Sequence, residues 1–206
     1  MPHGCKRLAD NSLMTSPTAY AELHCLSNFS FQRGASHADE LVVRAARLGY
    51  AAIAITDECS FAGIVRAHSA IKSYVEQRNE AFAAAAATAA ELEQAQRDWP
   101  PPPALIVGAE FHLRDGPSFV LLAPDRQAYA QISRLITRGR QTQPKGRYEL
   151  HKHDCSALDR CLALWLADEQ STSEHGRWLA ERTTKTWLAV ELHRGYDDAG
   201  LIERRR

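Results

Sequence analysis

One stretch of the sequence predicts the fold: SHADELVVRAARLGYAAIAITDECS, residues 36–60. Ser36 and Asp39 have the spacing of a capping box, and apolar residues then recur at helical intervals. Residues 50–56 follow as an apolar run of strand length, which ends in the polar group TDEC. A helix that leads into a buried strand with a polar end is the unit of a parallel α/β sheet or barrel. In such folds, reactive groups lie at the carboxyl ends of the strands.

The same alternation of strands and helices extends to both sides of this stretch. Further strands are expected over residues 21–26, 104–107, 118–123, 162–166 and 187–192, and further helices over residues 61–74 and 126–138. Residues 80–97 are rich in alanine, which favours a helix but offers little side chain to bury. We therefore expect an exposed helical insertion over about residues 73–103, which ends at the prolines 100–103.

The composition limits the class of protein. The chain has 206 residues, 25 basic and 25 acidic side chains and a net charge of zero, which excludes a generally basic protein that coats nucleic acid. Five cysteines, an odd number without a C-x-x-C pair or a secretory signal, favour reduced thiols in the cytoplasm. The longest uncharged apolar-rich run, residues 81–90, is half of the roughly 20 residues that a membrane span requires. We expect no membrane partner.

Three groups that can bind metals lie at or near the expected strand ends: His24, Asp57 and Glu110. In a barrel those ends converge on one face, so residues distant in sequence can share a site. A set of histidine and carboxylate ligands suits Zn²⁺, Mn²⁺ or Fe and the hydrolysis of phosphoesters. The alternative is that each group caps a strand or binds a loop, and spacing alone leaves both interpretations open.

Several segments resemble the motifs of the PHP (polymerase and histidinol phosphatase) domain family: residues 20–36, 48–63, 106–111 and 120–136. The sequences AELHCLSNFS, ITDEC and LITRGR are similar to those of error-prone bacterial DNA polymerases. The resemblance covers about residues 20–72 and 104–198. It implies a distorted seven-stranded βα barrel, incomplete at its C-terminus, over residues 19–198. A disordered leader, residues 1–18, is expected before it and a tail, residues 199–206, after it.

Active members of this family hold a di- or trinuclear metal site that hydrolyses phosphoesters, and the sequence departs from their ligand pattern. The second histidine of the first motif is replaced by Leu26, the histidine of Thr-Asp-His by Glu58, and a later histidine by Ser118. Arg33 stands where an acidic residue or histidine is usual. The candidate ligands that the resemblance leaves are those of a vestigial site: His24, Asp57, Glu58 and Glu110.

Arg33 places a cation in the expected ligand ring and disfavours metal binding by Coulomb repulsion. We expect Arg33 to pair with Asp57, Glu58 or Glu110 and to plug the site. No cofactor is then expected beyond weak binding of Mn²⁺, Zn²⁺ or Mg²⁺.

The resemblance implies a PHP domain from the N-terminus of an error-prone DNA polymerase, non-catalytic by itself. In the parent protein, which synthesises DNA during damage-tolerant replication and repair, the partners are DNA and other replication or translesion proteins. We expect an N-terminal fragment, because the sequence ends within the barrel and the polymerase palm is not present. The alternative is a free-standing metal-dependent phosphoesterase that uses His24, Asp57, Glu58 and Glu110.

One basic run is opposed only by Glu149, and its residues are Arg134, Arg138, Arg140, Lys145, Arg147 and Lys152. Such a run suits contact with DNA phosphates or with another polymerase domain, and a solvated basic face is an equal alternative. The group HKHDC, residues 151–155, resembles a metal-binding cluster. The loop before it favours a solvent-exposed segment instead.

Overall fold

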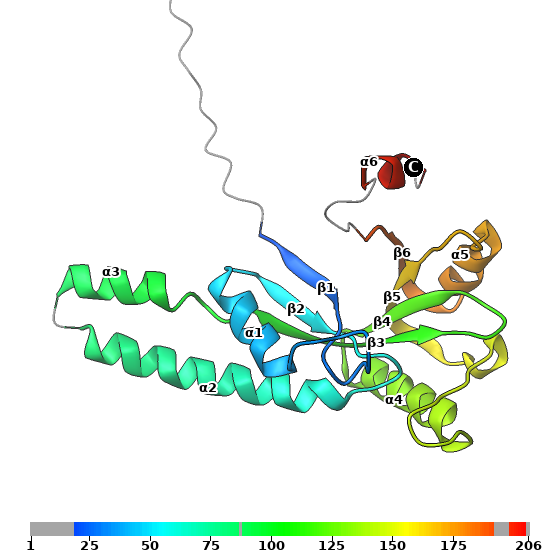
Figure 1. Ribbon diagram of the computed structural model, residues 1–206, viewed down its shortest axis with the longest axis horizontal. Coiled ribbons are helices and arrows are strands. Elements are labelled where there is room, and N and C mark those ends of the chain that lie inside the picture. Colours follow the sequence, from blue (N-terminus) through cyan, green and yellow to red (C-terminus); the bar gives the residue numbers. More distant parts are fainter. Residues whose placement is uncertain (1–18, 87, 192–197, 205–206) are drawn as a thin grey trace, which may run out of the picture.

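The computed structural model describes residues 19–86, 88–191 and 198–204, and its architecture is α/β. A six-stranded sheet has the strand order β1-β2-β3-β4-β5-β6. The strands are β1 Ala21–Cys25, β2 Ala52–Ile55, β3 Ala104–His112, β4 Ser118–Ala123, β5 Leu158–Leu166 and β6 Thr183–Ala189. The helices are α1 Ala38–Arg47, α2 Ala62–Ala84, α3 Ala89–Asp98, α4 Arg126–Gln141, η1 Lys152–Asp154, α5 Ser173–Ala180 and α6 Asp198–Arg204. The sheet curls like part of a barrel wall (Figure 1).

The alternation of side chains along each strand separates an outer from an inner face of this sheet. On the outer face, Ile53 and Ile55 of β2 pack against α1 and α2, and Phe119 of β4 belongs to the core formed with α4 and α5. On the inner face, Val120 and Leu164 join a smaller apolar cluster. Helices therefore cover the outside of the curl, as in a βα barrel.

The inner face surrounds a cavity of about 1100 Å³ between β1 and β6. Its lining includes Leu122, Leu164 and Trp187. In the described residues β1 and β6 are the two edge strands of the sheet. The architecture is therefore an incomplete barrel, which confirms the expected fold class.

The direction of β4 differs from an all-parallel barrel. β4 runs antiparallel to β3 and to β5, whereas β1, β2 and β3 are parallel to one another and β5 is parallel to β6. Only residues 113–117 connect β3 to β4, and they contain Gly116-Pro117. A parallel connection needs a crossover of a dozen residues or so, which a link this short cannot provide, so the two strands form a hairpin.

Most element bounds agree with the sequence pattern within a few residues, and three differ in an informative way. The predicted N-cap was Ser36, but α1 is capped one residue later, where the Glu40 carboxylate accepts from the His37 backbone N–H at 2.8 Å. Strand β3 continues to His112 and thereby includes Glu110. Helix α5 was not predicted, because its eight residues are too few to show a helical period.

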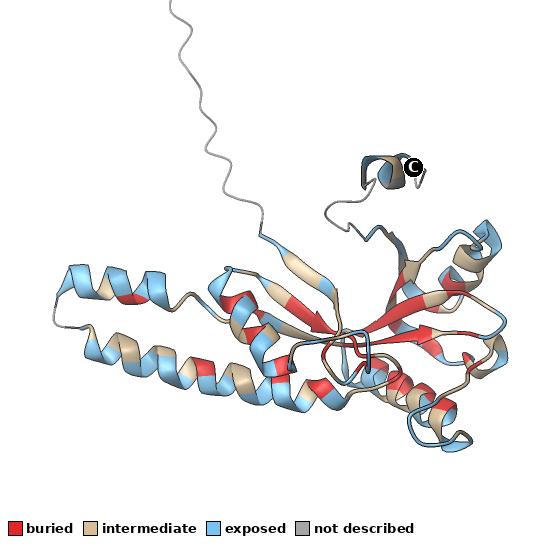
Figure 2. Cartoon of the chain, in the orientation of Figure 1, coloured by how far each residue is buried: buried red, intermediate tan, exposed pale blue. Residues whose placement is uncertain are grey.

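The alanine-rich segment forms two helices rather than one. Helices α2 and α3 lie side by side as a hairpin that projects from the sheet, and most of its residues are exposed (Figures 1 and 2). At its base the Tyr74 and Trp99 rings are in contact, with centroids 5.3 Å apart, and the Tyr74 hydroxyl donates to the Pro100 carbonyl at 2.9 Å. Whether this hairpin is an insertion into the domain stays a prediction.

Some predictions fall on residues outside the described ranges. These are the leader, residues 1–18, and the last residue of the predicted strand 187–192. Helix α6, Asp198–Arg204, begins at the last residue of the predicted domain and includes residues 199–204 of the predicted tail. Of the cysteines, Cys25, Cys59, Cys155 and Cys161 are free thiols. No helix in the described part of the chain is long and apolar enough to cross a membrane.

Candidate functional site

The carboxyl ends of β1 and β3 bring a histidine and a glutamate into contact. His24 Nε2 lies 2.8 Å from Glu110 Oε2, and His24 Nδ1 lies 2.5 Å from Glu191 Oε1, just beyond β6. On β3, His112 follows Glu110 by two residues and therefore lies on the same face of the strand. The His112 ring contacts the Glu110 carboxylate and bonds Ser118 Oγ through Nδ1 at 2.7 Å. The Glu110 side chain is fully buried.

Arg33 reaches this cluster from the loop after β1. Its Nη1 atom donates to Glu110 Oε1 at 2.7 Å and to Glu58 Oε2 at 3.0 Å. The same atom lies 3.3 Å from His112 Nε2. Arg33 thus pairs with two of the three carboxylates proposed from the sequence. We call Arg33, His24, Glu58, Glu110, His112 and Glu191 the ion network.

The charges of the ion network support one another. Burial disfavours the charged His24 ring, but its bonds to Glu110 and Glu191 outweigh this effect and raise the pKa of His24 to about 9. Burial would raise the pKa of Glu110, but hydrogen bonds from His112, His24 and Arg33 prevail and hold that pKa well below its usual range. At neutral pH, a guanidinium and an imidazolium therefore flank the buried carboxylate.

Asp57 lies near the network but has a different set of partners. Its carboxylate accepts from the Ser27 backbone N–H at 2.8 Å, from the Ser27 hydroxyl at 2.8 Å and from the Ser30 hydroxyl at 2.8 Å. A Cβ atom on Gly63 would lie 2.5 Å from Asp57 Oδ2, so the carboxylate is enclosed on that side too. Asp57 therefore ties the loop after β1 to the end of β2, and this loop carries Arg33.

On the other side, the network contacts a residue that the sequence offered as a candidate for contact with DNA or another domain. Arg140 of α4 donates through Nε to the Cys59 carbonyl at 2.7 Å and through Nη2 to the Glu58 carbonyl at 3.1 Å. Its guanidinium also lies over the Tyr148 ring, 5.9 Å from the centroid. Cys59 has a φ of 44°, in the left-handed region, and its N–H donates to the Glu110 carbonyl at 2.8 Å. Arg140 thus supports a strained turn beside the network.

The arrangement does not fit a divalent metal. Within residues 19–86, 88–191 and 198–204, no group of three His, Cys, Asp or Glu side chains is placed to hold one. The Arg33 guanidinium lies against Glu58, Glu110 and His112, which leaves their atoms committed to a cation that the protein supplies itself. Burial raises the pKa of Cys25 to about 11, so this neighbour of His24 is a neutral thiol and a poor ligand at neutral pH.

The remaining residues of the basic run lie away from this network. Arg138 pairs with Asp154 at 3.6 Å, and Arg134, Lys145 and Arg147 are exposed. In the HKHDC group, the His151 and His153 rings stack with centroids 5.4 Å apart. The thiol of Cys155 is buried and lies 3.8 Å from the His151 carbonyl, to which it donates.

The sequence indicated part of this site and missed other parts. Glu191 lies near the end of the predicted strand 187–192 but was not selected as a site residue, although an acidic residue at a strand end was the signal that selected Asp57. His112 was not among the predicted ligands, although its spacing of two from Glu110 would have assigned it to the same face of the strand. No sequence pattern marked Ser27 and Ser30 as site residues, because their role depends on the direction of the Asp57 side chain.

A comparison with models of protein families supports the resemblance found in the sequence. The model of the PHP domain matches residues 22–186. The chain belongs to the PHP domain family. Its candidate site lies where the resemblance in sequence placed the ligands of active PHP domains, but with Arg33 among them.

Curated relatives of this PHP domain are named error-prone DNA polymerases. The one from Pseudomonas paraeruginosa is 50% identical over 183 residues, which are 88% of this chain and 15% of the relative. The one from Pseudomonas aeruginosa is 48% identical over 189 residues, 91% of this chain and 16% of the relative. A relative from Azoarcus is 48% identical, over 90% of this chain and 18% of the relative. The chain thus spans less than a fifth of the length of these relatives.

A solved structure supports the same fold at low sequence identity. It is that of a protein from Bifidobacterium adolescentis described as a candidate metal-dependent phosphoesterase. It matches with a TM-score of 0.53 and 13% identity, covering 82% of this chain and 77% of that protein. The likeness concerns the fold alone.

Proposed function

We propose that the chain is a non-catalytic PHP domain in which the Arg33 guanidinium takes the place of a metal ion. The observation that carries this proposal is the position of Arg33 Nη1, 2.7 Å from Glu110 Oε1 and 3.0 Å from Glu58 Oε2. A fixed positive charge at this place neutralises the carboxylates that a divalent cation would need, and it repels the cation itself. The ion network then holds the strand ends of β1, β3 and β6 together.

In a longer protein similar to the error-prone polymerases, we propose that this domain is a structural part of the polymerase. Other parts of such a protein would carry out nucleotidyl transfer during damage-tolerant synthesis and repair, in the cytoplasm. Partners in replication or translesion synthesis would meet the domain through that longer protein. The names and identities of the relatives support this role, at 48–50% identity over 183 to 198 residues.

Calorimetric titration of the purified chain with Mn²⁺ and with Zn²⁺, combined with a phosphoesterase assay on p-nitrophenyl phosphate, tests the proposal. We expect no stoichiometric metal uptake and no turnover. Tight uptake of either metal, with turnover that His24→Ala abolishes, would support the alternative, a metal-dependent phosphoesterase, and would overturn the proposal. The fold of the Bifidobacterium protein is the observation that makes this alternative worth the assay.

The Arg33→Ala variant tests the structural role of the guanidinium. Its loss removes charge-assisted hydrogen bonds from the buried Glu110 and from Glu58, so we expect the free energy of unfolding to fall by about 1–3 kcal/mol. The matched control is Arg44→Ala on the exposed face of α1, which we expect to change it by at most about 0.5 kcal/mol. Urea unfolding of both variants measures the difference. Equal losses in the two variants would show that Arg33 has no structural role.

A further inference from the structure

The neutral chain is divided into a basic segment and an acidic remainder. Residues 134–152 contain six Lys and Arg residues and one acidic residue, Glu149, an excess of five positive charges. Because the whole chain has a net charge of zero, the rest of the sequence carries an equal negative excess. The positive charges lie on the second half of α4, on the loop after it and on η1. We call this region the basic surface.

The structure distinguishes cations that are committed from those that are available. Arg140 is committed to the backbone carbonyls of Glu58 and Cys59, and Arg138 is in a long ion pair with Asp154 while half exposed. Arg134, Lys145 and Arg147 are exposed. In the described part of the chain, none of these three makes a side-chain hydrogen bond or ion pair.

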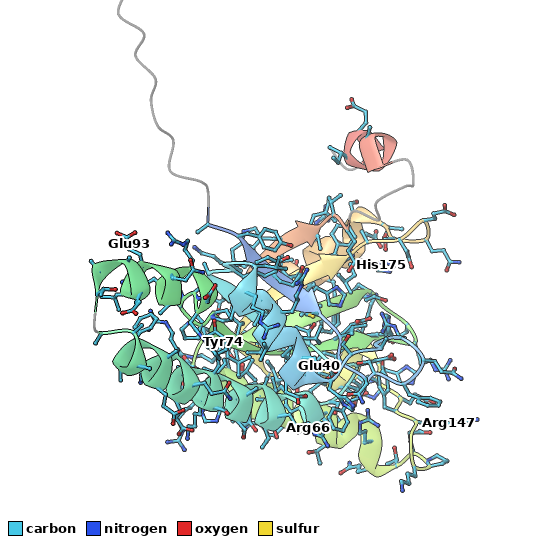
Figure 3. All side chains as sticks on the ribbon, turned by 60° about the vertical axis from the view of Figure 1, so that its left-hand side comes forward. Glu40, Arg66, Tyr74, Glu93, Arg147 and His175 are labelled. Atoms are coloured by element: carbon cyan, nitrogen blue, oxygen red, sulfur yellow. The ribbon has the colours of Figure 1, made fainter. Side chains whose placement is uncertain are left out.

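Backbone hydrogen bonds fix the loop that carries Lys145 and Arg147. The loop from residue 142 to 149 returns to its starting helix, because the Glu149 N–H donates to the Gly139 carbonyl at 3.0 Å. Within it, the Arg147 N–H donates to the Pro144 carbonyl at 3.0 Å, and Gly146 has a φ of 85° that suits glycine. Arg147 lies at the outer end of this loop and points away from the body of the domain (Figure 3).

The shape of the surface favours an extended polyanion over a small one. The hollow beside Arg134 and Arg138 has a volume of only about 80 Å³, too small for a nucleotide. Arg134 and Arg138 are four residues apart on α4, which separates them by about 6 Å along the helix axis. Phosphates of one DNA strand follow one another at about 3.4 Å along the duplex axis, so neighbouring side chains can contact phosphates of the same strand.

We propose that the basic surface binds the phosphodiester backbone of DNA without reading its sequence. The available cations Arg134, Lys145 and Arg147 provide the contacts together with the half-exposed Arg138. Arg140 anchors α4 through its bonds to the Glu58 and Cys59 carbonyls. The binding is electrostatic and therefore falls steeply with salt. This role is independent of the ion network and of metal binding.

Fluorescence anisotropy of a short labelled DNA duplex of arbitrary sequence tests this proposal. Binding is measured between about 50 and 200 mM salt for the wild-type chain and two triple variants. The first is Arg134→Gln, Lys145→Gln and Arg147→Gln. The control is Arg44→Gln, Lys72→Gln and Arg177→Gln, which removes the same charge from exposed positions on α1, α2 and α5. Thermal unfolding of both triples verifies that each is folded.

The wild-type chain and the control triple should bind with the same dependence on salt. In the first triple, the slope of log affinity against log salt should fall by about 1 for each phosphate that is no longer neutralised. Equal weakening in both triples would show a diffuse charge effect and overturn the proposal. So would absence of binding by the folded wild-type chain at the lowest salt.

Two further ligands decide the class of partner. Single-stranded DNA at the same salt shares the phosphodiester chemistry, and its affinity relative to the duplex tells which form the surface prefers. Polyglutamate carries negative charge without phosphate. If it bound in place of DNA, with the same dependence on Arg134, Lys145 and Arg147, the partner would be an acidic protein and the proposal would be wrong.

Discussion

Asp57 illustrates how a residue suited to metal binding takes a structural role. It is 1% exposed, and the three protons that it accepts come from Ser27 and Ser30 of the loop after β1. That loop carries Arg33, so the position of the guanidinium depends on a carboxylate that does not touch it. The sequence placed Asp57 correctly at the end of β2. Its role depends on the direction of its side chain, which points to Ser27 and Ser30.

Replacement of Asp57 by alanine should therefore destabilise the domain. The substitution leaves one N–H and two hydroxyl groups buried without an acceptor, and we expect the free energy of unfolding to fall by about 2–4 kcal/mol. Asp39→Ala on the exposed side of α1 is the control, with an expected change of at most about 0.5 kcal/mol. A loss in Asp57→Ala no larger than the control, measured by urea unfolding, would show that the loop has other support.

At the scale of elements, the first half of α2 packs on α1 and β2, and the Tyr74–Trp99 contact holds the base of the α2–α3 hairpin. Tyr74 is 4% exposed, while most of the alanine-rich residues are open to solvent. The Arg78 guanidinium adds a hydrogen bond to the Trp99 carbonyl at 3.0 Å and lies 4.2 Å from the centroid of the Phe82 ring. The sequence predicted a helix here from propensity, but not the turn that folds it back on itself.

Tyr74→Ala tests the importance of this base. Removing a buried ring leaves a cavity, and we expect a loss of about 3–5 kcal/mol in the free energy of unfolding. Tyr74→Phe keeps the ring and removes only the bond to the Pro100 carbonyl, so it should cost about 0.5–1.5 kcal/mol. Similar small losses for both variants would mean that the hairpin unfolds independently of the sheet.

Elsewhere the elements follow from local pattern more closely. The apolar run of β2 and the helical period of α1 and α4 were sufficient to predict them, because burial of one face is a local periodic requirement. The eight-residue α5 was too short to show such a period. The predicted N-cap of α1 was one residue too early, since Ser36 and His37 are each followed three residues later by an acidic residue.

At the scale of the whole molecule, the curl of the sheet brings its two edges together at one end. The His24–Glu191 contact joins the end of β1 to the end of β6, while a large cavity separates the edges along the rest of their length. A single imidazolium thus connects Glu110 of the centre of the sheet with Glu191 of its edge. The stability of the domain should then depend on the charge of His24.

The pH dependence has a defined sign. Because the pKa of His24 is raised from 6.5 to about 9 in the folded protein, its contribution is complete below pH 6.5 and is lost as the pH rises through 9. That loss amounts to at most about 3 kcal/mol. The low pKa of Glu110 acts oppositely, since its contribution is present above pH 4.5 and disappears in acid.

Unfolding free energies of the wild-type chain and of His24→Gln at a series of pH values measure this effect. The difference between the two proteins should be largest near pH 6 and should shrink steadily toward pH 9 and above. His68→Gln on the exposed side of α2 controls for the loss of a histidine and should follow the wild type. A constant difference across this range would show that His24 does not titrate as its contacts require.

The sequence alone determined the α/β class, most strands and helices, the family and the strand ends at which the site lies. These follow from short-range requirements, such as the period of burial, the turn chemistry and the order of motifs. Only the tertiary structure decided which atoms meet. The positions of Arg33, Glu191 and His112 around Glu110, the enclosure of Asp57 by two serines and the capture of Arg140 by backbone carbonyls all depend on long-range packing. Contacts between residues up to 167 positions apart are set by the curl of the sheet, which no local pattern encodes.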